Sequence, residues 1–240
     1  MNECIPRAAH VIPDSGQYYL ISADGSGVYE QVTRDFIHYS VPRPLIQAAD
    51  AEGITGWSSP HLSGDTLAVT VDTAEGRHGI RLFTTQEFMP GISRFRPEGG
   101  ILTPPDWDCT DGKLFFDQLF FTRRSVSGRD IYRILPGSRR DPQLILPGGE
   151  SPVLWLAPGE RAAMLYFRQG KAAAAAQFSP WVSAWTEIPL PIEIEGVSAS
   201  LYEEPDGGLI AMITREDGGT QFCHLEWMDG GCALIPREGI

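Results

Sequence analysis

The chain has 240 residues, of which 42% are hydrophobic, and a formal net charge of -12. Nucleic-acid binding is not expected, because attraction to phosphates needs a positive field. No stretch approaches the roughly 18 apolar residues of a membrane span, and the first residues lack the apolar core of a secretory signal. We therefore expect a protein without nucleic-acid or membrane partners, cytoplasmic unless this is the processed form of a secreted protein.

From the N-terminus onward, turn glycines that precede an apolar strand recur at intervals of 48, 48, 47 and 48 residues: Gly16, Gly64, Gly112, Gly159 and Gly207. Runs such as "DTLAVTVD" and "GLIAMITR" follow them and have the length and composition of strands. A Gly-bearing connection and two further strands complete each unit, and a strand with an aromatic residue precedes most of the glycines. Four-stranded units at this period, with no helices between them, predict a β-propeller.

Five such units fill the chain, so we predict an all-β fold with five four-stranded antiparallel blades in one domain. The expected blades span approximately residues 1–50, 51–97, 98–148, 149–194 and 195–240. The tract "KAAAAAQF" at residues 171–178 is the one segment with a high helix propensity. Its register matches the third strand of the fourth unit, and we predict a strand there. Both chain ends lie near the same point of the repeat, so no large strand exchange is expected where the ring closes.

The turns "PDSG", "LAPG" and "EPDGG", together with the later "DIYRI", resemble the TolB-type (WD-like) propeller repeat. The resemblance covers the whole chain, although no copy has the complete Trp-Ser-Pro-Asp-Gly turn of that family. It implies a propeller fold, which in such proteins serves as a binding platform or as an accessory domain of an enzyme. The function must then be argued from the site and not from the fold.

Charged residues recur where the channel of a propeller opens. One glutamate lies in the loop that leads into each first strand: Glu3, Glu52, Glu98, Glu150 and Glu195. Arg123, Arg168 and Arg215 fall at the ends of second strands, on the same face. The carboxylates would attract a cation or an amine, and the arginines would bind a carboxylate or phosphate. Alternatively these charges only shape turns and form exposed ion pairs, worth about 0–1 kcal/mol each.

Aromatic side chains recur in the first strands as Trp57, Trp107 and Trp155. Packing between blades is their expected role, and stacking on a sugar or another ring is the alternative, favoured most for Trp57 at the mouth. The four cysteines have no zinc-ligand spacing, so we expect no metal and no cofactor. Ca²⁺ stays possible, because carboxylates from several blades could supply some of its six to eight oxygens.

No sequence motif of a hydrolase nucleophile, zinc protease or phosphate-binding loop is present. A propeller glycosidase would need two channel-facing carboxylates. The first strands "RAAHV" and "ITGWSS" carry no acid, which leaves Asp106, Asp108 and His10 as catalytic candidates. The leading prediction is a propeller that binds a small molecule or peptide at the Glu-bearing mouth, and the alternative is a propeller enzyme of glycosidase or lyase type.

Overall fold

The computed structural model describes residues 10–51, 53–137, 141–168, 172–191, 193–228 and 230–237. These residues form five antiparallel sheets, each built from four strands that follow one another in the chain. The strands of the first three sheets are β1 (His10–Asp14), β2 (Gln17–Ala23), β3 (Val28–Thr33), β4 (Arg43–Pro44), β5 (Gly56–Ser63), β6 (Thr66–Asp72), β7 (His78–Thr84), β8 (Arg96–Ile101), β9 (Asp108–Phe115), β10 (Gln118–Ser125), β11 (Gly128–Ile134) and β12 (Gln143–Pro147). The last two sheets contain β13 (Gly149–Ala157), β14 (Arg161–Arg168), β15 (Ala173–Ser179), β16 (Ala184–Ile188), β17 (Ser198–Glu203), β18 (Leu209–Thr214), β19 (Thr220–Met228) and β20 (Gly231–Pro236).

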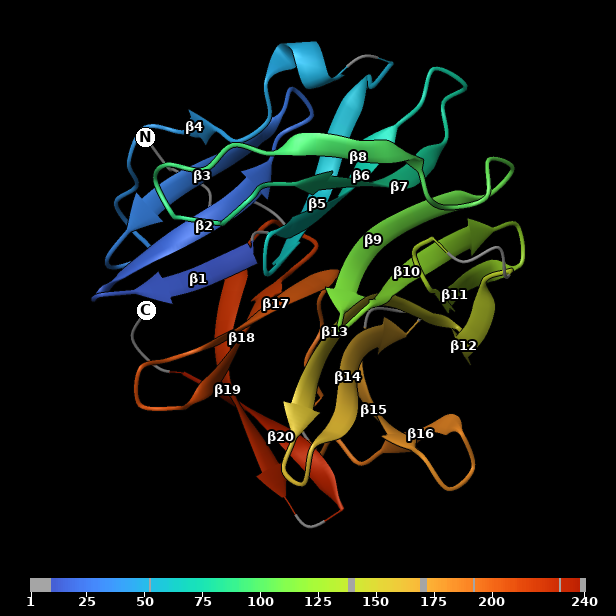
Figure 1. Ribbon diagram of the computed structural model, residues 1–240. Helices are drawn as coiled ribbons and strands as arrows, with labels where there is room; N and C mark the ends of the chain where they lie inside the picture. Colours follow the sequence, from blue (N-terminus) through green and yellow to red (C-terminus); the bar gives the residue numbers. More distant parts are fainter. Residues whose placement is uncertain are drawn as a thin grey trace.

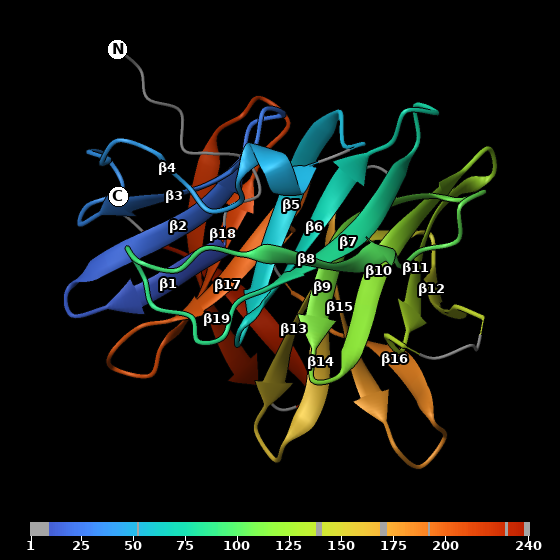
Figure 2. The ribbon, with the colours of Figure 1, turned by 45° about the horizontal axis from the view of Figure 1, so that its top comes forward.

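The five sheets are the blades of a propeller, which confirms the predicted fold (Figure 1). The first strand of each blade contacts the first strand of the next, in the order β1, β5, β9, β13 and β17, and β17 contacts β1 again. These five inner strands therefore form a closed ring around an axis. A short 3-10 helix, η1 (Ala48–Ala51), lies in the connection between β4 and β5 (Figure 2). No helix in the described part of the chain is long and apolar enough to cross a membrane.

The ring closes by side-chain packing between the first and last blades. Neither of these blades takes a strand from the other end of the chain. Phe36, Tyr202 and Phe222 instead pack in one buried cluster with Val11 of β1 and Ile210 of β18. Aromatic side chains bury large areas, which suits them to hold two sheets together without shared backbone hydrogen bonds.

The alanine tract is a strand, as predicted, despite its helix propensity. It forms β15, which pairs with β14 and β16. Ala175 packs in the core between blades four and five, whereas Ala174 and Ala176 pack toward blade three, against Phe120 and Tyr166. Small side chains on both faces let this strand lie between two neighbouring blades, and this packing outweighs the local propensity.

The position of one predicted turn is wrong. Gly112 lies inside the inner strand β9, and the hairpin turn of blade three lies four residues later, at Phe116 and Asp117. Phe116 itself takes the left-handed conformation of that turn, with φ 50°. Non-glycine residues rarely adopt this conformation, so the turn carries none of the usual glycine signal.

A buried ion pair joins the first two blades. Glu30 on β3 is 2% exposed and accepts hydrogen bonds from Arg43 Nε at 2.9 Å and from the Gly91 N–H at 3.0 Å. Arg43 also donates to the carbonyl of Ser93 at 3.0 Å. The pair thus fastens the loop between β7 and β8 of blade two onto β3 and β4 of blade one.

Replacing Glu30 with Ala leaves the Arg43 guanidinium without its carboxylate partner. Removal of one member of a fully buried pair typically costs about 3–5 kcal/mol. The Arg43 side chain is 28% exposed and can be partly rehydrated, so we expect the free energy of unfolding to fall by about 1–3 kcal/mol. Chemical denaturation measures it. The control is Glu226→Ala, which removes an exposed acid from β19 and is expected to change stability by less than about 0.5 kcal/mol. Equal losses in the two variants would contradict the structural role of the pair.

Candidate functional site

Three successive inner strands are bulged at equivalent positions. The pairing register shifts after Ser58 in β5, after Thr110 in β9 and after Glu150 in β13. The next residue in each strand is a non-glycine residue with positive φ: Ser59 at 46°, Asp111 at 57° and Ser151 at 51°. Bulges and strained residues of this kind are concentrated at functional sites, so these three neighbouring bulges mark the candidate site.

Threonines from the preceding blade hold two of these bulges in place. The Asp111 N–H donates to Thr70 Oγ1 at 3.0 Å, and the Ser151 N–H donates to Thr122 Oγ1 at 2.9 Å. Both threonines are buried and lie on second strands, β6 and β10. The amide groups that the bulges release from the sheet are therefore satisfied across the blade interface.

The carboxylate of Asp111 is oriented by two hydroxyl groups. Ser59 Oγ donates to Oδ1 at 2.8 Å from blade two, and Thr110 Oγ1 donates to Oδ2 at 2.8 Å from the same strand. Hydrogen bonds to both oxygens fix the carboxylate plane. A carboxylate held in this way beside the axis can act on a ligand without first reorganising.

Three nitrogen-bearing side chains, His10, His61 and Lys113, lie on the inner strands of the first three blades. The rings of His10 and His61 meet edge to face with centroids 4.9 Å apart. Burial, followed by the charge of Lys113, lowers the pKa of His10 from 6.5 to about 3, and burial also holds the pKa of His61 well below its usual value. Lys113 is 7% exposed, and burial lowers its pKa while the charge of Asp111 opposes the shift. The two imidazoles are consequently neutral at physiological pH.

Glu150, a predicted mouth residue, is buried in β13 at the residue before its bulge. It forms an ion pair with Arg129, which comes from β11 in blade three. Glu150 and Asp111 thus lie beside equivalent bulges of two adjacent inner strands, and β9 and β13 contact each other.

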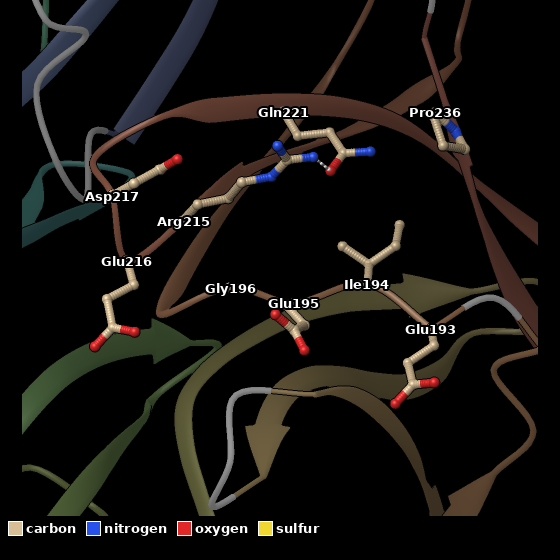
Figure 3. Close-up of a pocket in the computed structure, with 9 residues that line it drawn as sticks. All are labelled: Glu193, Ile194, Glu195, Gly196, Arg215, Glu216, Asp217, Gln221 and Pro236. Carbon is tan, nitrogen blue, oxygen red and sulfur yellow. Dashed lines mark hydrogen bonds between the residues drawn. The ribbon is translucent and has the colours of Figure 1, made fainter.

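A pocket of about 660 Å³ opens between blades four and five and contains two other predicted residues, Glu195 and Arg215. Figure 3 shows the Arg215 side chain turned toward Gln221, whose Oε1 accepts a hydrogen bond from it at 2.5 Å. The remaining residues of its lining are Glu193, Ile194, Gly196, Glu216, Asp217 and Pro236. Four carboxylates and one guanidinium line this pocket, and of these groups Glu195 and Arg215 are predicted by the sequence.

Other predicted residues lie away from these groups. Glu98 is exposed on β8, the outer strand of blade two, so its predicted position in a loop leading into blade three is wrong. Glu3 and Glu52 lie outside the described residues. Trp57 is 7% exposed and belongs to a core cluster with Ile21 and Val28 of blade one, which is the predicted packing between blades.

The other two predicted arginines have partners within their own blades. Arg123 stacks over the ring of Trp107 at 4.0 Å, and Arg168 pairs with Glu187 of β16 at 2.5 Å. Both guanidinium groups are thus already engaged, Arg123 on an aromatic ring and Arg168 on a carboxylate. Arg215 is the predicted arginine that lines a pocket together with a predicted glutamate.

The two catalytic candidates from blade three, Asp106 and Asp108, lie before the bulge of β9. Asp106 is exposed before β9 begins. Asp108 accepts a hydrogen bond from the His78 N–H at 3.0 Å, and its Oδ1 lies 2.6 Å from His78 Nδ1. Burial raises the pKa of Asp108, but the contacts with His78 outweigh it and the net pKa is lowered, which does not suit a proton donor.

Sequence reasoning missed Asp111, Lys113 and the bulges. The available signal is a Ser-Pro dipeptide that occurs within two inner strands, at Ser59-Pro60 and Ser151-Pro152. Asp111-Gly112 occupies the equivalent place in the inner strand between them. Pro within a strand marks a bulge, so the pattern points to irregular inner strands. Among the described residues, no group of three or more His, Cys, Asp or Glu side chains is placed to hold a metal ion.

No family model and no curated protein sequence matches the chain. Its fold is that of several solved glycoside hydrolases. A thermostable family-43 glycoside hydrolase aligns with a TM-score of 0.74 at 15% identity, covering 97% of this chain and 92% of that one. An endo-arabinase from Bacteroides thetaiotaomicron aligns with a TM-score of 0.74 at 18% identity over 100% and 96% of the two chains. An endo-1,4-beta-xylanase from the same organism has a TM-score of 0.72 at 14% identity, with coverages of 96% and 94%.

At these identities the similarity establishes the five-bladed propeller fold and nothing finer. The propeller part of the predicted resemblance is confirmed. The similar structures are glycoside hydrolases and not TolB-type propellers, so the TolB assignment is not supported.

The neutral histidines make stability depend on acidity. Unfolded His10 binds a proton below about pH 6.5, whereas folded His10 binds one only near pH 3. The stability is therefore complete above pH 6.5 and falls as the pH decreases toward 3, by about 1.4 kcal/mol per pH unit for each such histidine. We expect His10→Gln to reduce this slope, measured by urea denaturation between pH 7 and 4.5. An unchanged slope would place His10 in contact with water.

Proposed function

We propose that this chain is a glycoside hydrolase that binds an oligosaccharide at the mouth of the propeller. The observation that carries the proposal is the placement of Asp111 and Glu150 beside equivalent bulges in adjacent inner strands. Glycosidases cleave with a pair of carboxyl groups that flank the bond, one of which protonates the leaving oxygen. The glycosidase fold of the similar structures supports the same reading.

The geometry supports a site with two parts: a pair of catalytic carboxylates and a separate pocket that binds neighbouring sugars. Asp111 and Glu150 come from the inner strands, where cross-blade hydrogen bonds hold the backbone of Asp111 in place. The pocket around Glu195 and Arg215 offers carboxylate, amide and guanidinium groups that bind sugar hydroxyls through hydrogen bonds. A glycan with its scissile bond near the axis would place neighbouring sugars over this pocket.

Recognition without cleavage is the second candidate, and one observation favours it. Blades one and two present the imidazoles of His10 and His61 on their inner strands, and the only carboxylate among the described residues of β1 and β5 is Asp14, exposed at the hairpin turn. The reacting carboxylates would then have to come from blades three and four alone, and Glu150 already pairs with Arg129.

Incubation with arabino- and xylo-oligosaccharides, followed by chromatography of the products, separates the two candidates. We expect wild-type protein to release shorter sugars and both Asp111→Asn and Glu150→Gln to lower kcat by about 10²–10⁴. The matched control is Glu98→Gln, because Glu98 is exposed on an outer strand. Binding of an oligosaccharide without product would favour recognition alone, and absence of both would overturn the proposal.

Substrates with different leaving groups show which of the two carboxyl groups is the proton donor. A variant that lacks the proton donor should keep much more activity on 4-nitrophenyl glycosides than on oligosaccharides, because 4-nitrophenolate leaves without protonation. We expect this behaviour for Asp111→Asn and not for Glu150→Gln, because Glu150 forms an ion pair with Arg129, which favours the carboxylate that a base requires. Equal losses on both substrate types in Asp111→Asn would contradict its assignment as the acid.

A further inference from the structure

A second pocket lies between blades one and two, away from the residues of the proposed reaction. It encloses about 340 Å³ and is formed by four segments that are distant in the chain: residues 26–29, residues 44–51, Trp57 and Arg94. These segments belong to the loop before β3, to β4 with its connection through η1, to β5 and to the loop before β8 (Figure 2). Its described lining contains none of the neutral histidines or bulge residues, and neither Glu150 nor Glu195 contributes to it.

The floor of this pocket is apolar and rigid. Val28, Ile46 and Trp57 line it and belong to a buried core cluster, with exposed fractions of 1%, 8% and 7%. The backbone around them is fixed, since the Leu45 N–H donates to the Val28 carbonyl at 2.9 Å and Ile46 is bridged to Phe95. An apolar floor with a few polar groups above it is typical of small-molecule sites.

Tyr29 is held across the rim of the pocket. Its hydroxyl lies 2.8 Å from Ser26 Oγ, and Ser26 in turn donates to Asp24 at 2.7 Å. A Cβ atom on Gly27 would lie 3.1–3.4 Å from the Tyr29 ring and hydroxyl, so glycine at this position lets the ring lie close against the loop. The tyrosine is thereby oriented before any ligand arrives, which lowers the entropy cost of binding.

The charge of the pocket is opposite to that of the mouth. Arg94 lies on its rim, is exposed, and its side chain forms no hydrogen bond or ion pair with the described residues. None of the described residues that line this pocket carries a carboxylate, whereas four carboxylates line the pocket at blades four and five. On a chain with a net charge of -12, a free guanidinium over an uncharged floor is a local attractor for anions.

We propose that this inter-blade pocket binds a monosaccharide unit that carries a negative charge, either a carboxylate or a phosphate. Arg94 binds the anionic group, and the Ser26 and Tyr29 hydroxyls together with the Gln47 amide bind ring hydroxyls. The apolar face of the sugar lies over the floor formed by Val28, Ile46 and Trp57. The site is a binding site only, and it does not depend on the proposed hydrolysis.

The test uses three probes with the same ring size: glucuronic acid, glucose 6-phosphate and glucose. Titration calorimetry on the full chain should show binding of at least one charged probe and an affinity for glucose at least 10-fold weaker. The two charged arms identify the anionic group, since a carboxylate site prefers glucuronic acid and a phosphate site prefers glucose 6-phosphate. Failure of all three probes to bind, or equal binding of glucose, overturns the proposal.

Variants locate the site. Arg94→Gln should weaken the charged probe at least 10-fold and leave glucose unchanged. The matched control is Arg96→Gln, which removes the same charge two residues away, at an exposed position on β8 that does not line the pocket. Equal effects of Arg94→Gln and Arg96→Gln would mean that net charge alone attracts the anion, and the proposed site would be wrong.

Discussion

The structure depends on the contact between neighbouring blades. Each sheet forms its own ladder of backbone hydrogen bonds. The sheets are joined mainly by side-chain packing, with a small number of hydrogen bonds across the interfaces, such as those accepted by Thr70 and Thr122. The packing must also close, because β17 has to meet β1 after five steps around the axis. This requirement explains three features that look unrelated in the sequence. Alanines occur where one strand packs against blades on both of its faces, and an aromatic cluster lies at the junction of the first and last blades. The Glu30–Arg43 ion pair joins the first two blades. Packing of this kind tolerates wide variation in composition, and the period of the repeat can persist while the repeats themselves diverge.

The same constraint creates the candidate site. Inner strands approach one another closely, and a bulge in such a strand releases backbone amides that need a partner outside their own sheet. Thr70 and Thr122 accept two of these amides from the neighbouring blade, so each bulge is stabilised only when the blades are in register. Asp111 then depends on Ser59 of blade two for its orientation. A functional group held by residues of another blade is preorganised by the closure of the ring itself, which is why rigid scaffolds of this type can support a precise site.

The sequence predicted the architecture because the repeats keep their spacing even though their residues differ from one another. Five units, four strands in each and the strand at the alanine tract all follow from spacing and register. The site was less accessible to the same reasoning. Asp-Gly is a signal of both hairpin turns and bulges, and Gly112 falls at the expected interval even though it lies inside β9. Because Gly112 fits the regular spacing of the turn glycines, the sequence predicts Asp111 in a turn and not in the inner strand. Glu98 matched a recurring loop pattern, yet β8 extends through it, because strand ends depend on pairing with β7 and not on composition.

The two inter-blade pockets carry charges of opposite sign, although the chain as a whole is acidic. Carboxylates dominate the pocket at blades four and five, while Arg94 stands over an apolar floor at blades one and two. Between them, burial keeps His10 and His61 neutral, so the inner strands of blades one and two add no positive charge that would link the two fields. Interactions between exposed charges decay within about 8–10 Å at physiological salt, so each pocket selects its ligand by its own lining. A propeller can therefore carry separate specificities at different interfaces between its blades.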